Sequence, residues 1–309
     1  IRIVLAGDVM LGRGIDQALP HPGDPHLFED YASSARHYLE LAENANGPIG
    51  APLHVRDPWR AALKVLGHRP VAARIVNLET AITRRGRPEP KGINYRMSPA
   101  NLPCLAALAP DCCVLANNHA LDWGTTGLGD TLDALERADI AVAGAGRTAA
   151  DAEAPAILPR SDGGRILVFA AALPSSGVPA RWAATGDRPG VAYLPDTGTA
   201  SRRSLVGRIR EHRRPEDVVV ASLHWGPNWS HAIGTEERAF AHALIDEAGV
   251  DVVHGHSSHH PKAVEVHRDR PILYGCGDLM NDYEGIHGYE WYRGDLVLLY
   301  ELYLDAREH

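Results

Sequence analysis

Six short segments of this 309-residue chain carry side chains that can bind a metal ion, and an apolar run precedes most of them. They are Gly7–Asp8, Asn77–Glu79, Asn117–His119, His224–Gly226, His254–His259 and Gly275–Asp278. Apolar runs of this length are typical of buried strands, so we expect the polar side chains at strand ends. Ligands from several strand ends can converge on one or two divalent ions. Packing alone does not explain such a pattern, which therefore predicts a metal site.

The order of the predicted elements favours one α/β domain over residues 1–309, with mixed sheets flanked by helices. We expect strands at residues 1–7, 73–79, 111–117, 139–143, 155–173 (a hairpin), 217–223, 250–254, 262–267, 271–275 and 295–304. We expect helices at residues 125–138, 199–213 and 235–248. Segment 14–70 is interrupted by prolines, and we interpret it as an insertion over one face of the sheet. Long segments of this kind often act as lids or hold substrate.

Charge and hydropathy argue against several classes of partner. The net charge of −8 argues against nucleic acid, which requires a basic face. No apolar run reaches the roughly 18 residues of a membrane span, and no signal peptide is visible. The four cysteines predict small buried thiols in a reduced protein. We therefore expect a cytoplasmic protein with neither a membrane nor a nucleic-acid partner.

The first segments offer oxygen ligands. Asp8 ends a buried strand, where a carboxylate is costly unless it is paired or binds a cation, so it is a candidate ligand or catalytic group. Its alternative role is a helix N-cap. Glu79 shares a strand face with Asn77 and is a second candidate ligand, although a lone glutamate is usually a surface residue. Asn118 can offer its carbonyl oxygen to a hard cation, and its alternative is an Asx turn.

Three further residues are candidates for acid or base chemistry. His119 directly follows Asn118 and can act as the acid or base of the site. Asp122 lies three residues further on and can orient the ring of His119. Asp278 follows another strand and is a further candidate acid.

The later histidines are candidate nitrogen ligands. His224 ends a valine-rich run, a position where a lone histidine is more often structural. Four imidazoles then fall within seven residues, and the spacing leaves open which of them bind metal: His254, His256, His259 and His260.

A weaker set of residues is expected to bind substrate. Its members are Arg13, Lys91, Tyr95, Arg96 and Trp225. Arginine suits the bidentate capture of a carboxylate or phosphate, although a solvated surface position is an equal alternative for each of these cations.

Taken in order, these motifs resemble the CapA group, the poly-γ-glutamate capsule synthesis proteins with the calcineurin-like metallophosphoesterase fold. The motifs are Gly7–Arg13, Asn77–Glu79, Asn117–Gly124, His224–Gly226 and Gly255–His259. The resemblance covers nearly the whole chain and implies a four-layer α/β/β/α sandwich with a metal site at the strand ends. It places Asp8 and Glu79 on the aspartates of metallophosphatases and Asn118 with His119 on their Asn-His pair. By the same resemblance, the later histidines of the family match His224, His256 and His259.

The chain also departs from the metallophosphatase pattern. Met10 stands where those enzymes have a histidine, Glu79 replaces an aspartate, and Ala120 stands where an acid is usual. One of two metal sites has therefore lost a ligand, which puts a two-metal clamp for phosphoryl transfer in doubt. We expect one strong site, whose metal remains open among Mn²⁺, Zn²⁺, Fe²⁺ and Ca²⁺. Its expected ligands are Glu79, Asn118, His224 and His256.

The resemblance leads us to expect a metal-dependent enzyme whose partner is a peptide or another carboxylate-bearing ligand. A metal-bound carbonyl makes the adjacent Cα–H more acidic, and two flanking groups can remove and return that proton. A lasso-peptide epimerase is known in the CapA-like group, so our first expectation is Cα epimerisation in a ribosomally made precursor peptide. The alternative is a metallophosphoesterase or a poly-γ-glutamate capsule enzyme. A non-catalytic, metal-stabilised binding protein is the third.

Overall fold

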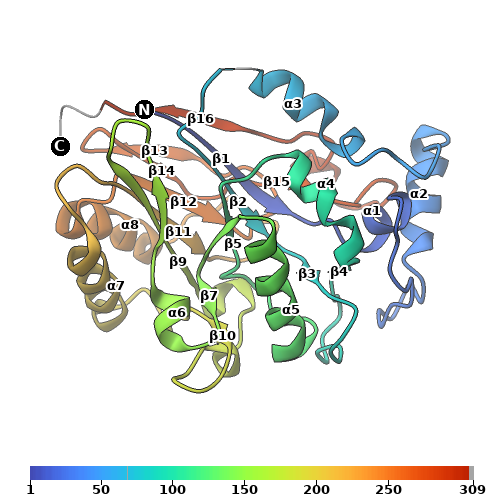
Figure 1. Ribbon diagram of the computed structural model, residues 1–309, viewed down its shortest axis with the longest axis horizontal. Helices are drawn as coiled ribbons and strands as arrows, with labels where there is room; N and C mark the ends of the chain where they lie inside the picture. Colours follow the sequence, from blue (N-terminus) through green and yellow to red (C-terminus); the bar gives the residue numbers. More distant parts are fainter. Residues whose placement is uncertain (68, 306–309) are drawn as a thin grey trace.

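Two β-sheets lie face to face in the computed structural model, which describes residues 1–67 and 69–305 (Figure 1). The first sheet has the order β15 (Asp278–Met280), β1 (Arg2–Val9), β2 (Ala73–Leu78), β5 (Cys112–Val114) and β6 (Ala141–Ala143). These strands pair in parallel, and β16 (Tyr300–Tyr303) adds antiparallel to the start of β1.

The second sheet has the order β13 (Val264–His267), β14 (Arg270–Leu273), β12 (Val252–His256), β11 (Val218–His224), β9 (Arg165–Ala172) and β8 (Ala156–Pro159). Its inner strands are parallel, and β13 and β8 close its two edges antiparallel. Two small pairs complete the strands: β3 (Ala81–Ile82) with β4 (Arg96–Met97), and β7 (Ala145–Gly146) with β10 (Gly190–Val191). The helices are α1 (Arg13–Ala18), α2 (Arg36–Asn46), α3 (Arg60–Leu66), α4 (Leu102–Ala107), α5 (Gly124–Arg137), α6 (Ala149–Glu153), α7 (Thr199–His212) and α8 (Thr235–Ala248).

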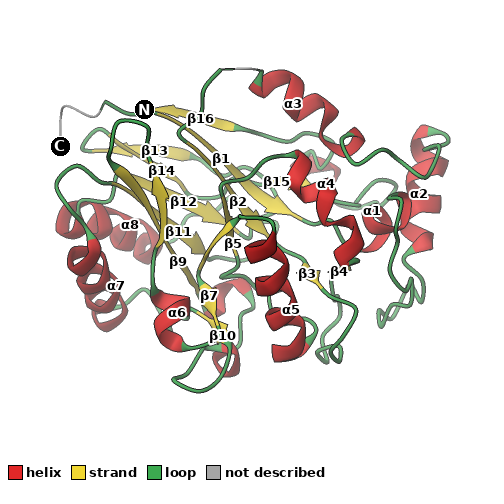
Figure 2. Ribbon diagram, in the orientation of Figure 1, coloured by secondary structure: helices red, strands yellow, loops and turns green. Residues whose placement is uncertain are grey.

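The alternation of side chains along the inner strands explains the layers. On β11, Val218 and Val220 face the core between the sheets, whereas Val219 and Ala221 pack with α7 and α8. A strand buried on both faces needs apolar residues at every position, which is why these segments are continuous valine-rich runs. Helices α7 and α8 cover the second sheet, and α4 and α5 cover the first (Figure 2). The predicted α/β sandwich is confirmed.

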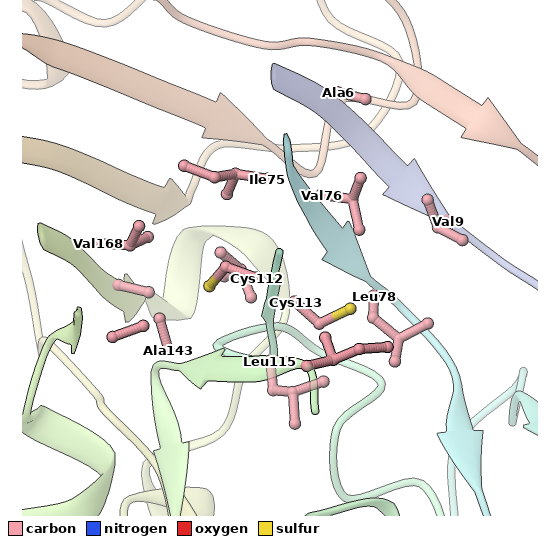
Figure 3. Close-up of a cluster of buried hydrophobic side chains, with 14 of the residues drawn as sticks. Ala6, Val9, Ile75, Val76, Leu78, Cys112, Cys113, Leu115, Ala143 and Val168 are labelled. Carbon is pink, nitrogen blue, oxygen red and sulfur yellow. The ribbon is translucent and has the colours of Figure 1, made fainter. Parts of the chain in front are cut away.

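The core between the sheets contains small thiols as well as branched apolar side chains (Figure 3). Cys112 and Cys113 are fully buried on β5, and all four cysteines are free and buried, as predicted. Burial raises the pKa of the Cys113 thiol, so at neutral pH it stays protonated and unreactive.

Most predicted elements occur within a few residues of their expected bounds, and three differences bear on the site. Strand β15 was not predicted, and the strand expected at 295–304 is limited to Tyr300–Tyr303. The strand expected at 111–117 ends at Val114, so Asn117 and His119 lie in the following turn. No helix among the described residues combines the length and apolarity that crossing a bilayer demands.

Candidate metal centre and its cavity

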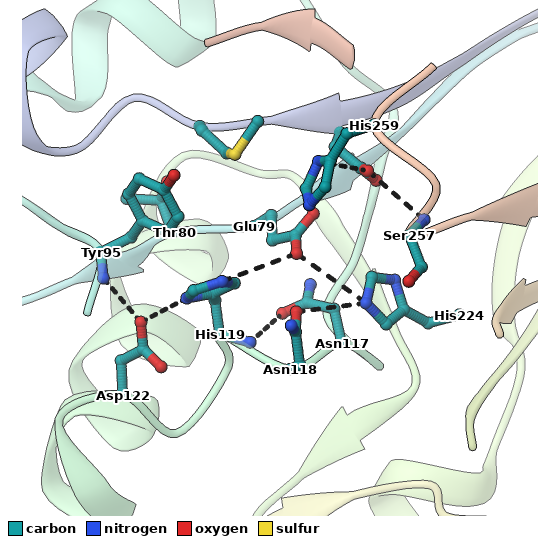
Figure 4. A network of polar contacts seen from close by, with 12 residues as sticks. Glu79, Thr80, Tyr95, Asn117, Asn118, His119, Asp122, His224, Ser257 and His259 are labelled. Atoms are coloured by element: carbon teal, nitrogen blue, oxygen red, sulfur yellow. Dashed lines mark hydrogen bonds and ion pairs between the residues drawn. The ribbon is translucent and has the colours of Figure 1, made fainter. Parts of the chain in front are cut away.

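The carboxyl ends of parallel strands from both sheets bring the candidate ligands together (Figure 4). Strand register sets Asp8 of β1 beside Asp278 of β15, and His224 of β11 beside His256 of β12. All four side chains are buried. The carboxyl ends of β1, β11 and β12 and the start of β15 therefore gather residues that are distant in the sequence.

A glycine allows β1 and β15 to approach each other. A Cβ atom at Gly7 would lie 1.8 Å from the carbonyl oxygen of Gly277, a distance that no side chain permits. The amide of Asp8 donates to that same carbonyl at 2.9 Å. Gly7 is therefore the residue that permits Asp8 and Asp278 to lie side by side.

Glu79 has a buried carboxylate oxygen without a hydrogen-bond partner. Its Oε1 lies 3.8 Å from Nε2 of His224 and 3.9 Å from Nε2 of His119. The Asn118 Oδ1 lies 3.2 Å from the same His224 nitrogen. Atoms that share a divalent ion at about 2.1 Å lie roughly 3 to 4 Å apart. Glu79, Asn118 and His224 therefore have the spacing of a ligand set.

A second group of ligand atoms adjoins the first. The Nδ1 of His259 lies 2.9 Å from Asp278 Oδ1 and 3.5 Å from Asp8 Oδ2. Asp8 also offers an oxygen within 4.8 Å of nitrogens of His224 and His256. Asp8 thus lies between the two groups and could serve as a ligand to an ion held by the first.

The electrostatics of the cluster favour a bound cation. Burial raises the pKa of Asp8 to about 6, and burial together with the charge of Asp8 raises the pKa of Glu79 well above its usual value. Burial lowers the pKa values of His224 and His256, so both imidazoles are neutral at pH 7. Neutral imidazoles are the form that binds a divalent ion, and a bound cation would relieve the repulsion among these crowded carboxylates. Together with the unpaired oxygen of Glu79, they fit the metal that the fold family implies.

His119 forms a pair with Asp122 beside this cluster. The His119 Nδ1 lies 2.6 Å from Asp122 Oδ2, and the Lys91 Nζ lies 2.6 Å from the other carboxylate oxygen. Burial lowers the pKa of His119 to about 4, so the neutral ring donates from Nδ1 and leaves Nε2 free to accept a proton. This is the arrangement of a general base.

The pKa of His259 is shifted in the opposite direction to that of His119. Burial would lower the pKa of His259, but the carboxylates of Asp278, Glu79 and Asp8 together raise it to about 10. Its backbone φ is 58° and that of Ser257 is 99°, values that non-glycine residues rarely adopt. The Ser257 amide donates to Asp8 Oδ2 at 3.3 Å. This strained turn therefore holds an imidazole against three carboxylates.

A cavity of about 580 Å³ opens onto the two imidazoles. It is lined by His119 and His259, by Arg13, Tyr31, Ala45, Ile93, Tyr95, Asn228 and Trp229, and by residues from Tyr283 to Asp295. The sequence did not indicate Trp229, Tyr283 or Tyr289, because aromatic residues in loops carry no spacing signal. Segment 14–70 contributes Tyr31 and Ala45, whereas the segment after β15 forms a larger share of the wall.

Only some of the predicted substrate-binding residues line the cavity. Arg13 and Tyr95 line the cavity, and the Tyr95 ring centroid lies 4.5 Å from that of His119. Arg96 lies over the ring of Trp123 at 3.7 Å and is not among the residues that line this cavity.

Two predicted residues lie behind the site. Trp225 is buried in the outer core, and its Nε1 donates to the Tyr274 carbonyl at 3.0 Å. His254 lies 2.9 Å from the Ser222 hydroxyl and 3.0 Å from the Ala6 carbonyl, so both of its nitrogens have partners within the core.

Known proteins are similar to this sequence over most of its length. The chain matches the family of bacterial capsule synthesis proteins PGA_cap over residues 2–283. A probable polyglutamine synthesis accessory protein of Mycobacterium tuberculosis is 48% identical over 302 residues, which cover 97% of this chain and 79% of that protein. The PGA biosynthesis protein CapA of Bacillus subtilis is 26% identical over 279 residues, covering 89% of this chain and 62% of that protein. The chain therefore belongs to the PGA_cap, or CapA-like, family of bacterial capsule synthesis proteins.

Proposed function

We propose that this protein is a metal-dependent enzyme that acts at a carbonyl group of an amide-linked glutamate chain. One observation carries the proposal: the unpaired Glu79 Oε1 lies between Nε2 of His224 and Nε2 of His119, beside a cavity that His119 lines. The names of the relatives support the polymer as substrate, and the residues of the site support the chemistry.

Glu79, Asn118 and His224 would hold the ion, with Asp8 and His256 as neighbouring ligands. A divalent ion, when bound, supplies a Lewis acid that polarises a carbonyl. His119 would accept a proton at Nε2 from an attacking water, while Asp122 fixes its tautomer through Nδ1–H and Lys91 holds Asp122. His259, paired with Asp278, would donate a proton to the amine that leaves when the amide bond breaks.

Cα epimerisation is the second candidate, and a specific observation favours it. His119 and His259 both line the cavity, and each is paired with a carboxylate. In the metal-free protein, burial lowers the pKa of His119 to about 4 and the surrounding carboxylates raise that of His259 to about 10, so the two imidazoles differ in protonation at pH 7, as removal and return of one proton would require.

Mass spectrometry of a γ-linked glutamate oligomer incubated with the Mn²⁺-loaded protein in D₂O tests these proposals. A change in chain length that a chelator abolishes is the expected result. Deuterium uptake without any change in length would favour epimerisation instead. Fast hydrolysis of a phosphoester, with neither change in the oligomer, would contradict both.

A further inference from the structure

We infer that a second metal site, separate from the candidate metal centre, lies between helix α8 and the edge strand β13 and takes one zinc ion. Its side chains are His242 and Asp246 on α8, and Glu265 and His267 on β13. Strand β13 runs antiparallel to β14, so His267 lies toward the amino end of the sheet, away from the metal centre at the carboxyl end. This inference does not depend on the proposed function, because it uses none of the residues of that site.

The spacing of the four residues places them on two facing surfaces. Residues four apart lie on one face of a helix, and residues two apart lie on one face of a strand. The Nε2 of His242 lies 2.6 Å from Glu265 Oε1, and the Nε2 of His267 lies 2.9 Å from Asp246 Oδ1. The two imidazole rings stack with their centroids 3.9 Å apart.

Three of these residues are close enough to share an ion. Ligand atoms of His242, Glu265 and His267 all lie within 4.8 Å of one another. Ligands of one zinc ion, at about 2.1 Å from it, lie roughly 3 to 4 Å apart. Small rotations of the side chains would therefore bring all three atoms onto one ion.

The polarity of β13 is the reverse of the pattern that packing against a helix predicts. The side of a strand that faces a helix is normally apolar, and the side that faces water is polar. On β13, Glu265 and His267 face α8, whereas Val264 and Val266 are 53% and 67% exposed. Core packing does not explain this arrangement, which indicates that the polar side chains facing α8 bind a ligand.

Glu265 has the charge and the orientation of a metal ligand. Burial would raise its pKa, but hydrogen bonds from His242 and Tyr274 lower the pKa below its usual value, so the carboxylate is charged at pH 7. The Tyr274 hydroxyl donates to Glu265 Oε2 at 2.9 Å, while Oε1 points to His242. Carboxylates that bind a metal are typically oriented by such a second hydrogen bond.

The ligand types favour zinc. Two imidazoles and a carboxylate suit Zn²⁺, whereas Mn²⁺ prefers oxygen ligands and would bind here more weakly. Each imidazole would bind through Nε2 and keep its proton on Nδ1. The side chains of His242, Glu265 and His267 are 28%, 27% and 22% exposed, so water can reach the fourth position. Asp246 is less suited to that position, because Arg268 already contacts it at 2.8 Å.

Calorimetric titration of Zn²⁺ into metal-free protein tests the inference by counting sites. We expect the wild type to bind one more zinc ion than His267→Gln, with affinity at the α8–β13 site at least about tenfold weaker in the variant. Glutamine is a poor zinc ligand but keeps a hydrogen-bond donor for Asp246. His37→Gln is the matched control, because His37 also pairs with a carboxylate, that of Glu40 on α2, and this variant should keep the wild-type number of sites.

The Glu79→Gln background separates this site from the metal centre. Zinc should raise the melting temperature of Glu79→Gln, and this rise should disappear in the double variant Glu79→Gln/His267→Gln. An equal rise in both proteins, or equal numbers of zinc ions in the wild type and His267→Gln, would overturn the inference. The histidines would then serve only as hydrogen-bonding partners of Glu265 and Asp246.

His242→Gln repeats the test from the helix if His267→Gln does not fold, and it should lose the same zinc ion. Full zinc binding in a folded His242→Gln protein would also contradict the inference. Because the metal centre is tested through Glu79 and this site through His242 and His267, the failure of one leaves the other standing.

Discussion

In the proposed chemistry, proton transfer and metal binding are carried out by different residues. His119 accepts the proton in this scheme, and Glu79 holds the cation. Both are buried, and their reactive atoms lie 3.9 Å apart. Substitutions can therefore separate the two roles.

His119→Ala should reduce turnover by about 10²–10⁴-fold and leave Mn²⁺ affinity close to that of the wild type, because the ring transfers a proton and is not among the proposed ligands. Steady-state rates and calorimetric Mn²⁺ titration check the two parts. His37→Ala, on an exposed part of α2, is the control. A variant that loses metal but keeps its rate once saturated with Mn²⁺ would assign the ring to the metal instead.

Glu79→Gln should remove the stabilisation that metal provides and leave the metal-free protein at least as stable as the wild type. Its buried carboxylate, whose pKa burial raises, is unfavourable without a cation. At a hundredfold excess over Kd, bound metal adds about 2.7 kcal/mol to the free energy of unfolding. Thermal melting with and without Mn²⁺ measures the difference, and the exposed Glu284→Gln is the control. An equal metal-induced shift in Glu79→Gln would exclude Glu79 as a ligand.

The sequence was informative about the cluster because polar residues at the ends of apolar runs have few other uses. It could not reveal which atoms meet. His254 and His256 share a strand face, yet His254 has partners in Ser222 and Ala6, while His256 reaches His224. Which of the two histidines reaches His224 depends on the register between β12 and β11, and this register cannot be read from the sequence of β12 alone.

At the scale of elements, a buried ion-pair cluster ties together segments that are distant in sequence. Arg13 begins α1 and pairs with Glu29 of segment 14–70 and with Asp282 just after β15. Its guanidinium also lies 3.9 Å from the centre of the Tyr38 ring. Arg13 therefore joins two walls of the cavity.

Arg13→Ala should lower the free energy of unfolding by roughly 3–5 kcal/mol, because two buried carboxylates lose their partner. Urea unfolding of the metal-free protein measures this loss. Arg96→Ala, whose guanidinium lies over the Trp123 ring outside the cavity, is the comparison and should cost less. Should Arg13→Ala remain stable while KM rises, Arg13 would bind the anionic group of the substrate, as the sequence first suggested.

Strand β15 is an element that the sequence did not predict. It has only three residues, and its place beside β1 depends on the close contact of Gly7 with Gly277. The long valine-rich strands were predictable from their continuous apolar runs, and the helices α5, α7 and α8 from apolar residues at helical spacing. The aromatic segment after β15 carries none, which explains why most of the cavity wall was not predicted.

Across the whole molecule, buried neutral histidines make stability depend on pH. Burial lowers the pKa of His254 from 6.5 to about 4. Between these values the unfolded chain binds more protons at this site than the folded protein, so acid favours unfolding. From pH 7 to pH 5, His254 should account for a loss of about 2 kcal/mol.

Urea unfolding of the metal-free wild type and His254→Gln at both pH values isolates this effect. Asp8, whose pKa is raised, acts in the opposite direction but is common to both proteins. The wild type should lose more stability on acidification than the variant. Equal losses would show that His254 titrates normally in the folded protein.

We propose that strand ends from both sheets form one tight metal site, and calorimetric titration of Mn²⁺ into the metal-free protein measures its stoichiometry and affinity. We expect saturable binding of one tight ion, with any second ion much weaker because Met10, a thioether, cannot replace an imidazole ligand for this cation. Glu79→Gln should abolish the tight phase. Absence of binding, or a tight phase that Glu79→Gln leaves intact, would rule out this metal site.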